Sequence, residues 1–262
     1  MPPTHTHGRN QALDIGWEIL LLLAAVAVAA GFIDAVAGGG GLLTIPALLF
    51  VGVPPVQAIA TNKLQACFGS FTATRFFVRQ GLVQPWTQRW AIVATAIGAV
   101  IGAIAIQLFD SELLVQLMPF GLMAIALYLL LAKNFGQGSG QARLKEAPFN
   151  ASVATGVGVY DGFFGPGTGT FFSLGYSKLR GMNLVQATAH AKLLNFTTNI
   201  VSLLVFIASG QILFQIGLAM ALGQALGARL GAAAAVKQGV DFIRYMTVAV
   251  CIAMSVSLLL RQ

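Results

Sequence analysis

Two lysines and two aspartates recur at matching places in the two halves of this chain of 262 residues. Lys63 and Lys192 are 129 positions apart, and Asp34 and Asp161 are 127 positions apart. All four interrupt apolar stretches of sequence. An ionisable group within a membrane costs roughly 2.5–3.5 kcal/mol, so it is usually paired or functional. The pattern therefore indicates charge chemistry in an apolar medium.

The lysines allow two interpretations. In the first, both ammonium groups face a central cavity and attract an oxyanion, to which nearby amide and hydroxyl groups donate hydrogen bonds. These groups belong to Thr61, Asn62, Asn195 and Thr197. His190, which matches Thr61 in the second half, could titrate near neutral pH or act as a hydrogen-bond partner. In the second interpretation, each lysine extends to the membrane interface or pairs with a carboxylate for stability.

Asp34 and Asp161 each lie within about a turn of a glycine-rich break. They could carry a coupling proton, because burial disfavours the charged form of a carboxylate. They could equally be permanent counter-ions of Lys63 and Lys192. The sequence leaves both roles open.

The glycine-rich breaks are residues 38–41, four consecutive glycines, and the Gly-Pro-Gly-Thr-Gly run at 165–169. Broken backbone at membrane depth must be buried in protein or line a cavity, and paired broken segments predict a transporter's substrate site. Gly39, Gly40, Gly167 and Gly169 are candidate residues at which backbone N–H groups approach an anion. Other glycines recur at four-residue spacing, which is typical of close helix packing. These are Gly98, Gly102, Gly223, Gly227 and Gly231.

A duplication relates the two halves. Residues 56–64 and 185–193 are identical at six of nine positions, and Gly31-Phe32-Ile33-Asp34 corresponds to Gly158-Val159-Tyr160-Asp161. Asp, Gly and Lys recur in the same order, which chance similarity between apolar segments does not explain. We interpret the chain as two repeats of one unit.

The composition predicts a membrane protein. The chain is 57% hydrophobic and only 9% charged, with a mean hydropathy of +0.81. A soluble domain carries roughly 25% charged residues. The pI near 9.9 does not indicate nucleic-acid binding, because the basic residues are scattered between apolar runs. Expected apolar segments are residues 15–37, 42–53, 56–79, 89–108 and 113–132, then 151–164, 170–176, 185–207, 212–236 and 242–260.

Five segments in each half is an odd number, so the second repeat should be inverted relative to the first. This arrangement places most basic residues on one side, which the positive-inside rule makes cytoplasmic, and only Arg9 and Arg261 on the other. Both termini are then outside. The expected organisation is a polar leader (1–14), membrane repeat 1 (15–132), a cytoplasmic linker (133–150) and membrane repeat 2 (151–262).

Enzyme chemistry finds little support in the sequence. Cys67 and Cys251 are isolated, and no Cys/His cluster indicates a metal site or a disulfide framework. No Walker A sequence or His/Ser/Asp set is present, and neither glycine run follows a strand. We expect no cofactor, no metal and no ATP-driven transport by this chain alone.

The run from Gly31 to Lys63 resembles the first motif of the TauE/SafE sulfite exporter family. It combines Gly-x-x-Asp, a glycine run, Leu-x-x-x-Pro-x-Leu and Ala-Thr-Asn-Lys. The region from Gly158 to Asn195, including the second break, is similar to the family's second motif. The resemblance covers essentially the whole chain. It implies a bacterial inner-membrane permease for sulfite, sulfonates or other organosulfur anions.

The sequence thus predicts an all-α, polytopic membrane protein with two inverted repeats of about five helical segments each. Its expected function is secondary transport of a small, sulfur-containing oxyanion at the interface between the repeats. A passive anion channel and, less well supported, an intramembrane enzyme are the alternatives. The expected partners are the anionic substrate and the lipid bilayer, with a homodimer left open and nucleic acid excluded.

Overall fold

The computed structural model describes residues 16–109 and 141–259, and within these ranges every regular element is helical. The predicted all-α class is confirmed. The leader (1–14), the apolar segment at 113–132 and the linker up to residue 140 lie outside the described residues. The first half contains α1 (Trp17–Ala37), α2 (Gly41–Phe50), α3 (Pro55–Arg79), η1 (Pro85–Gln88), α4 (Arg89–Ala105) and η2 (Ile106–Leu108). The second contains α6 (Glu146–Phe149), η3 (Asn150–Ala154), α7 (Thr155–Phe163), α8 (Thr168–Leu179), α9 (Leu184–Ala208) and α10 (Phe214–Leu259).

Four stretches of helix are long and apolar enough to cross a membrane: Trp17–Ala37, Pro85–Leu108, Leu184–Ala208 and Phe214–Gly239. The apolar α2 is shorter, as expected. Two outward-facing stripes fit a lipid environment. The stripe on α4 consists of Val93, Ile97 and Ile101, and the stripe on α10 consists of Leu222, Leu226 and Leu230, each shifted by 129 positions. These features are those of a polytopic membrane protein.

The structure repeats the correspondence seen in the sequence. α3 and α9 both have 25 residues, and a shift of 129 maps the bounds of one onto those of the other. Each helix is flanked by glycines with positive φ. These values are 84° at Gly52 and 71° at Gly81 around α3, and 70° at Gly181 and 69° at Gly210 around α9. The same backbone geometry therefore begins and ends both central helices.

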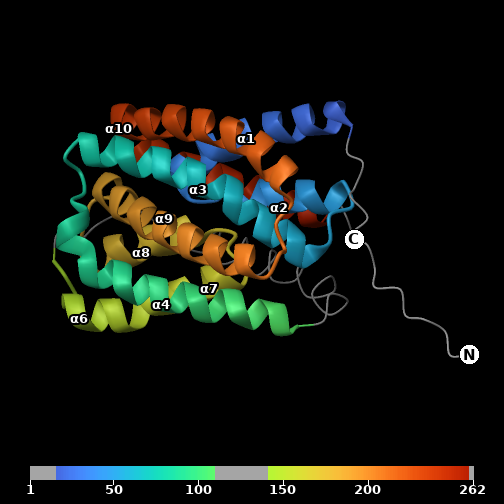
Figure 1. Cartoon of the computed structure of the whole chain (residues 1–262). Coiled ribbons are helices and arrows are strands. Elements are labelled where there is room, and N and C mark those ends of the chain that lie inside the picture. Colours follow the sequence, from blue (N-terminus) through green and yellow to red (C-terminus); the bar gives the residue numbers. More distant parts are fainter. Residues whose placement is uncertain (1–15, 110–140, 260–262) are drawn as a thin grey trace, which may run out of the picture.

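Corresponding helices run in opposite directions (Figure 1). In that view α3 runs from right to left and its counterpart α9 from left to right. In the other pair, α4 runs from left to right and its counterpart α10, up to Gly239, from right to left. The halves also interlock, because α1 packs mainly on α10 and α7 mainly on α4. Each half thus completes the packing of the other.

Glycines allow this interlocking, as their four-residue spacing predicted. A Cβ at Gly227 would lie 2.8 Å from the backbone nitrogen of Phe32 on α1. The equivalent Cβ at Gly98 would lie 2.8 Å from the backbone nitrogen of Val159 on α7. Side chains at these positions would force the helices apart, so the packing interpretation of these glycines is confirmed.

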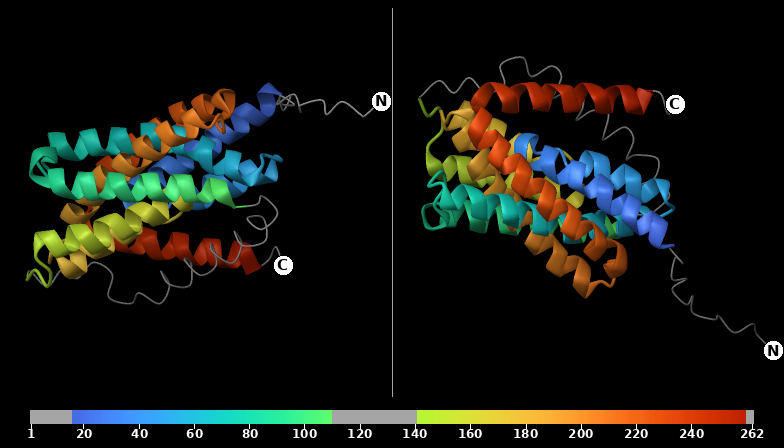
Figure 2. Two further views of the ribbon diagram at one scale, coloured as in Figure 1. Left: turned by 60° about the horizontal axis from the view of Figure 1, so that its bottom comes forward. Right: turned by 90° about the horizontal axis from the view of Figure 1, so that it is seen from above.

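Three boundaries differ from the sequence-based prediction. The short second-half segment is longer than 170–176, because α8 extends over Thr168–Leu179. A helix begins at Glu146, within the expected linker, since Pro148 is tolerated in the first turn. The break expected after residue 236 is confined to Gly239 (φ 75°, ψ −156°), beyond which the chain turns back along the bundle (Figure 2, right).

Candidate functional site

The two glycine-rich breaks cross each other at the centre of the bundle. α1 ends at Ala37 and α7 ends at Phe163, and positive φ values follow at Gly38 (81°) and Gly165 (98°). A Cβ at Gly38 would lie 2.6 Å from the Cα of Gly169, so the backbones of the two breaks are in contact. The hydroxyl of Thr170 donates a hydrogen bond to the carbonyl of Ala37 across this crossing. Residues without side chains are needed here because backbone meets backbone.

Each repeat's lysine forms an ion pair with the other repeat's aspartate. Lys63 Nζ on α3 lies 2.9 Å from Asp161 Oδ1 on α7, and Lys192 Nζ on α9 lies 2.8 Å from Asp34 Oδ2 on α1. All four residues are buried, with exposed fractions between 0% and 6%. The counter-ion interpretation of the aspartates therefore describes this conformation. Removing one member of such a pair leaves a buried, uncompensated charge, which typically costs about 3–5 kcal/mol.

Glycine also makes room for both ammonium groups. A Cβ at Gly165 would lie 3.0 Å from Lys63 Nζ, and a Cβ at Gly169 would lie 3.1 Å from Lys192 Nζ. Lys63 donates a second hydrogen bond, to the backbone carbonyl of Asp161 in the last turn of α7. The negative end of the α7 dipole stabilises a cation at this position.

A small cavity lies between the two breaks, and both halves contribute to it. The space open to the centre of a water molecule is about 20 Å³, enough for one water molecule or so. The lining is polar and contains both carboxylates but neither lysine. It consists of Asp34, Gly38, Gly41, Asn62, Ala66, Asp161, Gly165, Thr168, Gly169, Asn195, Asn199 and Gln224. Each aspartate therefore touches the cavity on one side and a lysine on the other.

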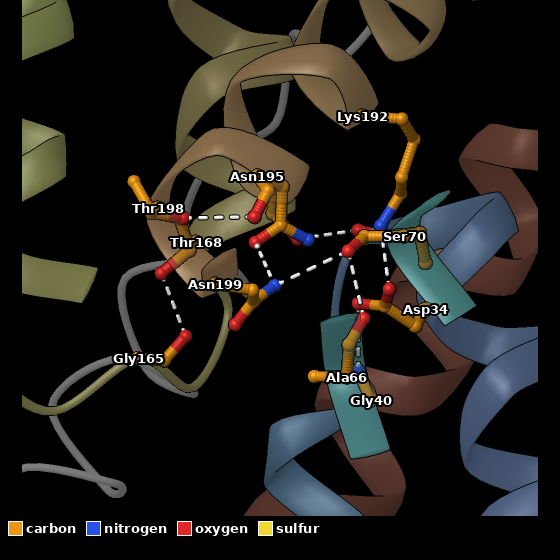
Figure 3. Close-up of polar contacts among 12 residues, drawn as sticks. Asp34, Gly40, Ala66, Ser70, Gly165, Thr168, Lys192, Asn195, Thr198 and Asn199 are labelled. Carbon is orange, nitrogen blue, oxygen red and sulfur yellow. Dashed lines mark hydrogen bonds and ion pairs between the residues drawn. The ribbon is translucent and has the colours of Figure 1, made fainter. Parts of the chain in front are cut away.

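Amide side chains form the remaining polar wall. Asn199 donates to Asn195 Oδ1 at 3.2 Å and lies 3.5 Å from the hydroxyl of Ser70 on α3. Figure 3 shows this chain of amides beside Lys192, which extends from α9 to Asp34. Asn62 accepts hydrogen bonds at 2.5 Å from Thr44 and at 2.7 Å from Gln65. Amides offer both donors and acceptors, so this wall can bind polar ligands of either kind.

The structure gathers only part of the predicted site at the cavity. Five predicted residues line it: Asp34, Asp161, Asn62, Asn195 and Gly169. Lys63 and Lys192 do not line it, but each contacts one of the two aspartates that do. Gly40 donates its backbone N–H to Asp34 Oδ1 at 3.3 Å. Gly39 and Gly167 belong to the breaks but do not line the cavity, and Gly167 is the N-cap of α8.

Three predicted residues make their hydrogen bonds elsewhere. Thr61 accepts the N–H of Leu213, which begins the approach to α10, at 3.1 Å. Thr197 donates to the carbonyl of Leu193 one turn earlier in α9, at 3.0 Å. The His190 ring bonds to the Gln186 carbonyl at 2.9 Å, away from the cavity lining. In this conformation none of the three faces the cavity.

Asn199 and Gln224 line the cavity but were not predicted. Both interrupt apolar segments, and Asn199 follows Asn195 by one helical turn on the same face, which is a pattern that the sequence displays. Gln224 corresponds to Thr95 in the first half, so a polar residue recurs there as well. No cluster of metal-ligating side chains is found among the residues that the structure describes. Cys67 is a buried free thiol.

Comparison with known proteins identifies the family. Residues 23–258 match the family described as Sulfite exporter TauE/SafE. The chain is 46% identical over 250 residues to the probable membrane transporter protein YfcA of Escherichia coli K12, covering 95% of this chain and 93% of that protein. It is 43% identical over 246 residues to the probable membrane transporter protein ORF9 of a Sinorhizobium species (94% of each chain). It is 41% identical over 250 residues to a probable membrane transporter protein of Haemophilus influenzae (95% and 98%).

No solved structure matches this chain. The family match and the relatives each extend over nearly its whole length, and the family resemblance of the two motifs is confirmed. The apolar helices agree with a protein of the membrane. The chain belongs to the sulfite exporter TauE/SafE family of membrane transporters.

Proposed function

We propose that this chain is a multi-pass secondary transporter of the bacterial inner membrane that moves a small, sulfur-containing oxyanion. The observation that carries the proposal is the pair of buried Lys–Asp contacts that join the two repeats beside the crossed glycine breaks. Two ammonium groups in an apolar interior attract an anion strongly once their carboxylates no longer neutralise them. The sulfur-containing substrate class is supported by the description of the family.

The chemistry of the cavity suits a small polar ligand. Amide groups of Asn62, Asn195, Asn199 and Gln224 surround it, and none of the described residues that line it has a large apolar side chain. Its present volume is that of about one water molecule. An oxyanion therefore enters only when the breaks move apart, which is the behaviour expected of an occluded state in alternating access. The ion pairs hold this state closed, and we propose that substrate replaces a carboxylate as the partner of a lysine.

The proposed topology is two inverted repeats with both termini outside. Its support is that corresponding helices run in opposite directions (Figure 1). The end of α3, the start of α4 and the loop before α9 lie at one end of the bundle, on the left. Basic residues occur at these element ends, namely Arg75, Arg79, Arg89, Lys178 and Arg180. The positive-inside rule makes this end cytoplasmic.

A ligand-stability screen tests the proposal. Purified full-length protein is heated with sulfite, thiosulfate, sulfate, methanesulfonate or acetate, each at several concentrations. A substrate that binds only the folded state stabilises the protein by mass action and so raises Tm. At a ligand concentration one hundred times Kd, the gain in the free energy of unfolding is about 2.7 kcal/mol. We expect a sulfur oxyanion to raise Tm more than acetate does. If no oxyanion raises Tm, or acetate is as effective, the proposed substrate class is wrong.

Flux measurements separate a carrier from a channel. In proteoliposomes, uptake of the anion that stabilises the protein should saturate with concentration, because each transport cycle passes through the occluded state. Conductive flux that rises linearly with anion concentration would instead show a passive channel.

A further inference from the structure

Asp34 and Asp161 are equivalent in the repeat but differ in their hydrogen bonds. Asp34 uses both carboxylate oxygens, because Oδ2 accepts from Lys192 at 2.8 Å and Oδ1 accepts the Gly40 N–H at 3.3 Å. Asp161 uses one oxygen for both of its side-chain contacts: Lys63 lies 2.9 Å from Oδ1, and the Thr168 hydroxyl donates to Oδ1 at 2.7 Å. Asp161 Oδ2 is buried and has no hydrogen-bond partner within the described part of the chain.

A sequence difference between the repeats accounts for part of this inequality. A shift of 127 from Asp34 to Asp161 places Thr168 opposite Gly41. In the second repeat the hydroxyl of Thr168 reaches Asp161, whereas Gly41 has no side chain and Asp34 is bonded by backbone instead. The pseudo-symmetry of the fold therefore leaves one free acceptor, on Asp161 alone of the two carboxylates.

The charge around the cavity opposes an anion in the present state. Two carboxylates line it, and the lysines that neutralise them lie behind, so the four charges sum to zero. A lone anion entering here meets carboxylates at close range and adds a net buried charge, which an apolar interior disfavours. Protonation of one carboxylate removes its negative charge, so it no longer repels the anion. The lysine beside it is then no longer neutralised, and its positive charge balances the charge of the anion.

We propose that the transported anion is accompanied by a proton, and that Asp161, not Asp34, takes up this proton at Oδ2. The inference rests on the proposed function and names its coupling residue. One proton leaves the aqueous phase, one O–H bond forms at Oδ2, and one anion enters, so the net charge of the site is unchanged for a monoanion. Lys63 stays in place because it also donates to the backbone carbonyl of Asp161. Its positive charge is then available to the anion.

Few charged groups lie near Asp161 among the described residues. Lys63 on α3 contacts the carboxylate directly, while Lys192 on α9 and Asp34 on α1 form the other pair across the crossing. On α7 itself, the Tyr160 hydroxyl donates to the Pro166 carbonyl at 2.5 Å. The face of α4 that packs on α7 contains Gly98, Ala99 and Gly102 and no titratable side chain. Lys63 is thus the one charge in direct contact with Asp161 in this part of the structure.

Calorimetry measures the proton count. The anion that gives the largest Tm increase in the ligand screen is titrated into full-length wild type, Asp161→Asn and Asp34→Glu in buffers of different ionisation enthalpy. Wild type should take up about one proton more per anion than Asp161→Asn, because linkage ties affinity to the protons bound. Asp34→Glu, the control, keeps the carboxylate that neutralises Lys192 and should keep the wild-type proton count. The affinity of wild type should rise by up to about tenfold per unit of falling pH, and that of Asp161→Asn should not.

Each outcome decides the proposal. If wild type and Asp161→Asn bind the anion with equal proton counts, or if Asp34→Glu lowers the proton count as much as Asp161→Asn does, Asp161 is not the coupling residue. If Na⁺ at constant pH raises the Tm of wild type but not of Asp161→Asn, the free oxygen serves a metal cation and the proton proposal is wrong. If no anion binds to wild type, it is the proposed function that fails.

A second measurement applies if Asp161→Asn does not fold. Infrared difference spectra of wild type on anion addition should show the carbonyl band of a newly protonated carboxyl group. Asp161→Glu, which keeps a carboxyl group, should shift this band, and Asp34→Glu should leave it unchanged. A band that shifts only in Asp34→Glu, or no band at all, would overturn the proposal.

Discussion

Lys63 and Asp161 form an ion pair between two residues that lie 98 positions apart and in different repeats. Its counterpart, Lys192 with Asp34, spans 158 positions. In both, the lysine comes from a long central helix and the aspartate from a helix that ends at a glycine break. The charges that we assign to the anion site therefore also join the two repeats. If the anion replaces a carboxylate as the partner of a lysine, the contact between the repeats is broken in the same step.

Lys63→Met should lower both stability and anion binding. The variant leaves Asp161 buried without its cation, which should cost about 3–5 kcal/mol in the free energy of unfolding. Adding Asp161→Asn should restore most of this loss, and Asp34→Asn should not, because Asp34 pairs with Lys192. Thermal unfolding of the single and double variants in detergent measures the effect. Equal rescue by both Asn substitutions would contradict the observed pairing.

The restored double variant separates stability from binding. It should fold, and it has no charge at this pair, so it should bind the anion that stabilises wild type more weakly. The loss corresponds to a charge-assisted hydrogen bond of about 1.5–3 kcal/mol. Lys192→Met with Asp34→Asn should behave in the same way. Normal anion binding by both double variants would show that the lysines are structural and that the site lies elsewhere.

Gly38→Ala should destabilise the protein and abolish transport. A Cβ there would lie 2.6 Å from Gly169 Cα, and the positive φ of 81° alone costs a non-glycine residue roughly 1–2 kcal/mol. Gly156→Ala on α7 is the control, because nothing lies within 4 Å of its Cβ. The two Tm values and anion uptake in proteoliposomes should differ accordingly. Unchanged uptake in Gly38→Ala would mean that the breaks need not stay in contact.

Asn199→Ala and Thr197→Val should differ although they are neighbours on α9. Asn199 lines the cavity, so its loss should weaken anion binding by about 0.5–1.5 kcal/mol. The Thr197 hydroxyl bonds within its own helix, so Thr197→Val should leave binding unchanged. Titration of both purified variants with the stabilising anion tests this. If Thr197→Val weakened anion binding more than Asn199→Ala does, Thr197 would be part of the binding site and this prediction would be wrong.

Single cysteines can establish the topology. In a background with Cys67→Ala and Cys251→Ala, we introduce Gln84→Cys between α3 and α4 and Ser209→Cys between α9 and α10. Both positions are exposed and follow corresponding helices. An impermeant thiol reagent should label residue 209 from outside the cell and residue 84 only after permeabilisation. Labelling of both from the same side would refute the inverted arrangement.

The sequence alone determined the class of protein, the duplication and most of the residues at the breaks. Long apolar runs are a property of the linear chain, and a helix must be about 20 residues long to cross the bilayer. The duplicated glycine runs also predicted where the structure is broken, because consecutive glycines do not favour helix and allow positive φ. The packing glycines on α4 and α10 were predicted by their four-residue spacing for the same local reason.

Only the tertiary structure decided which of these residues meet. Thr61 and Asn62 are neighbours on α3, but only Asn62 lines the cavity, because successive residues on a helix are rotated by about 100°. The pairing of each lysine with the other repeat's aspartate joins α3 to α7 and α9 to α1. These helices are far apart in the sequence, so no local pattern contains the contact. The free oxygen of Asp161 depends on where Lys63 and Thr168 place their donors, and such distances of a few ångströms arise only when three separate segments are packed together.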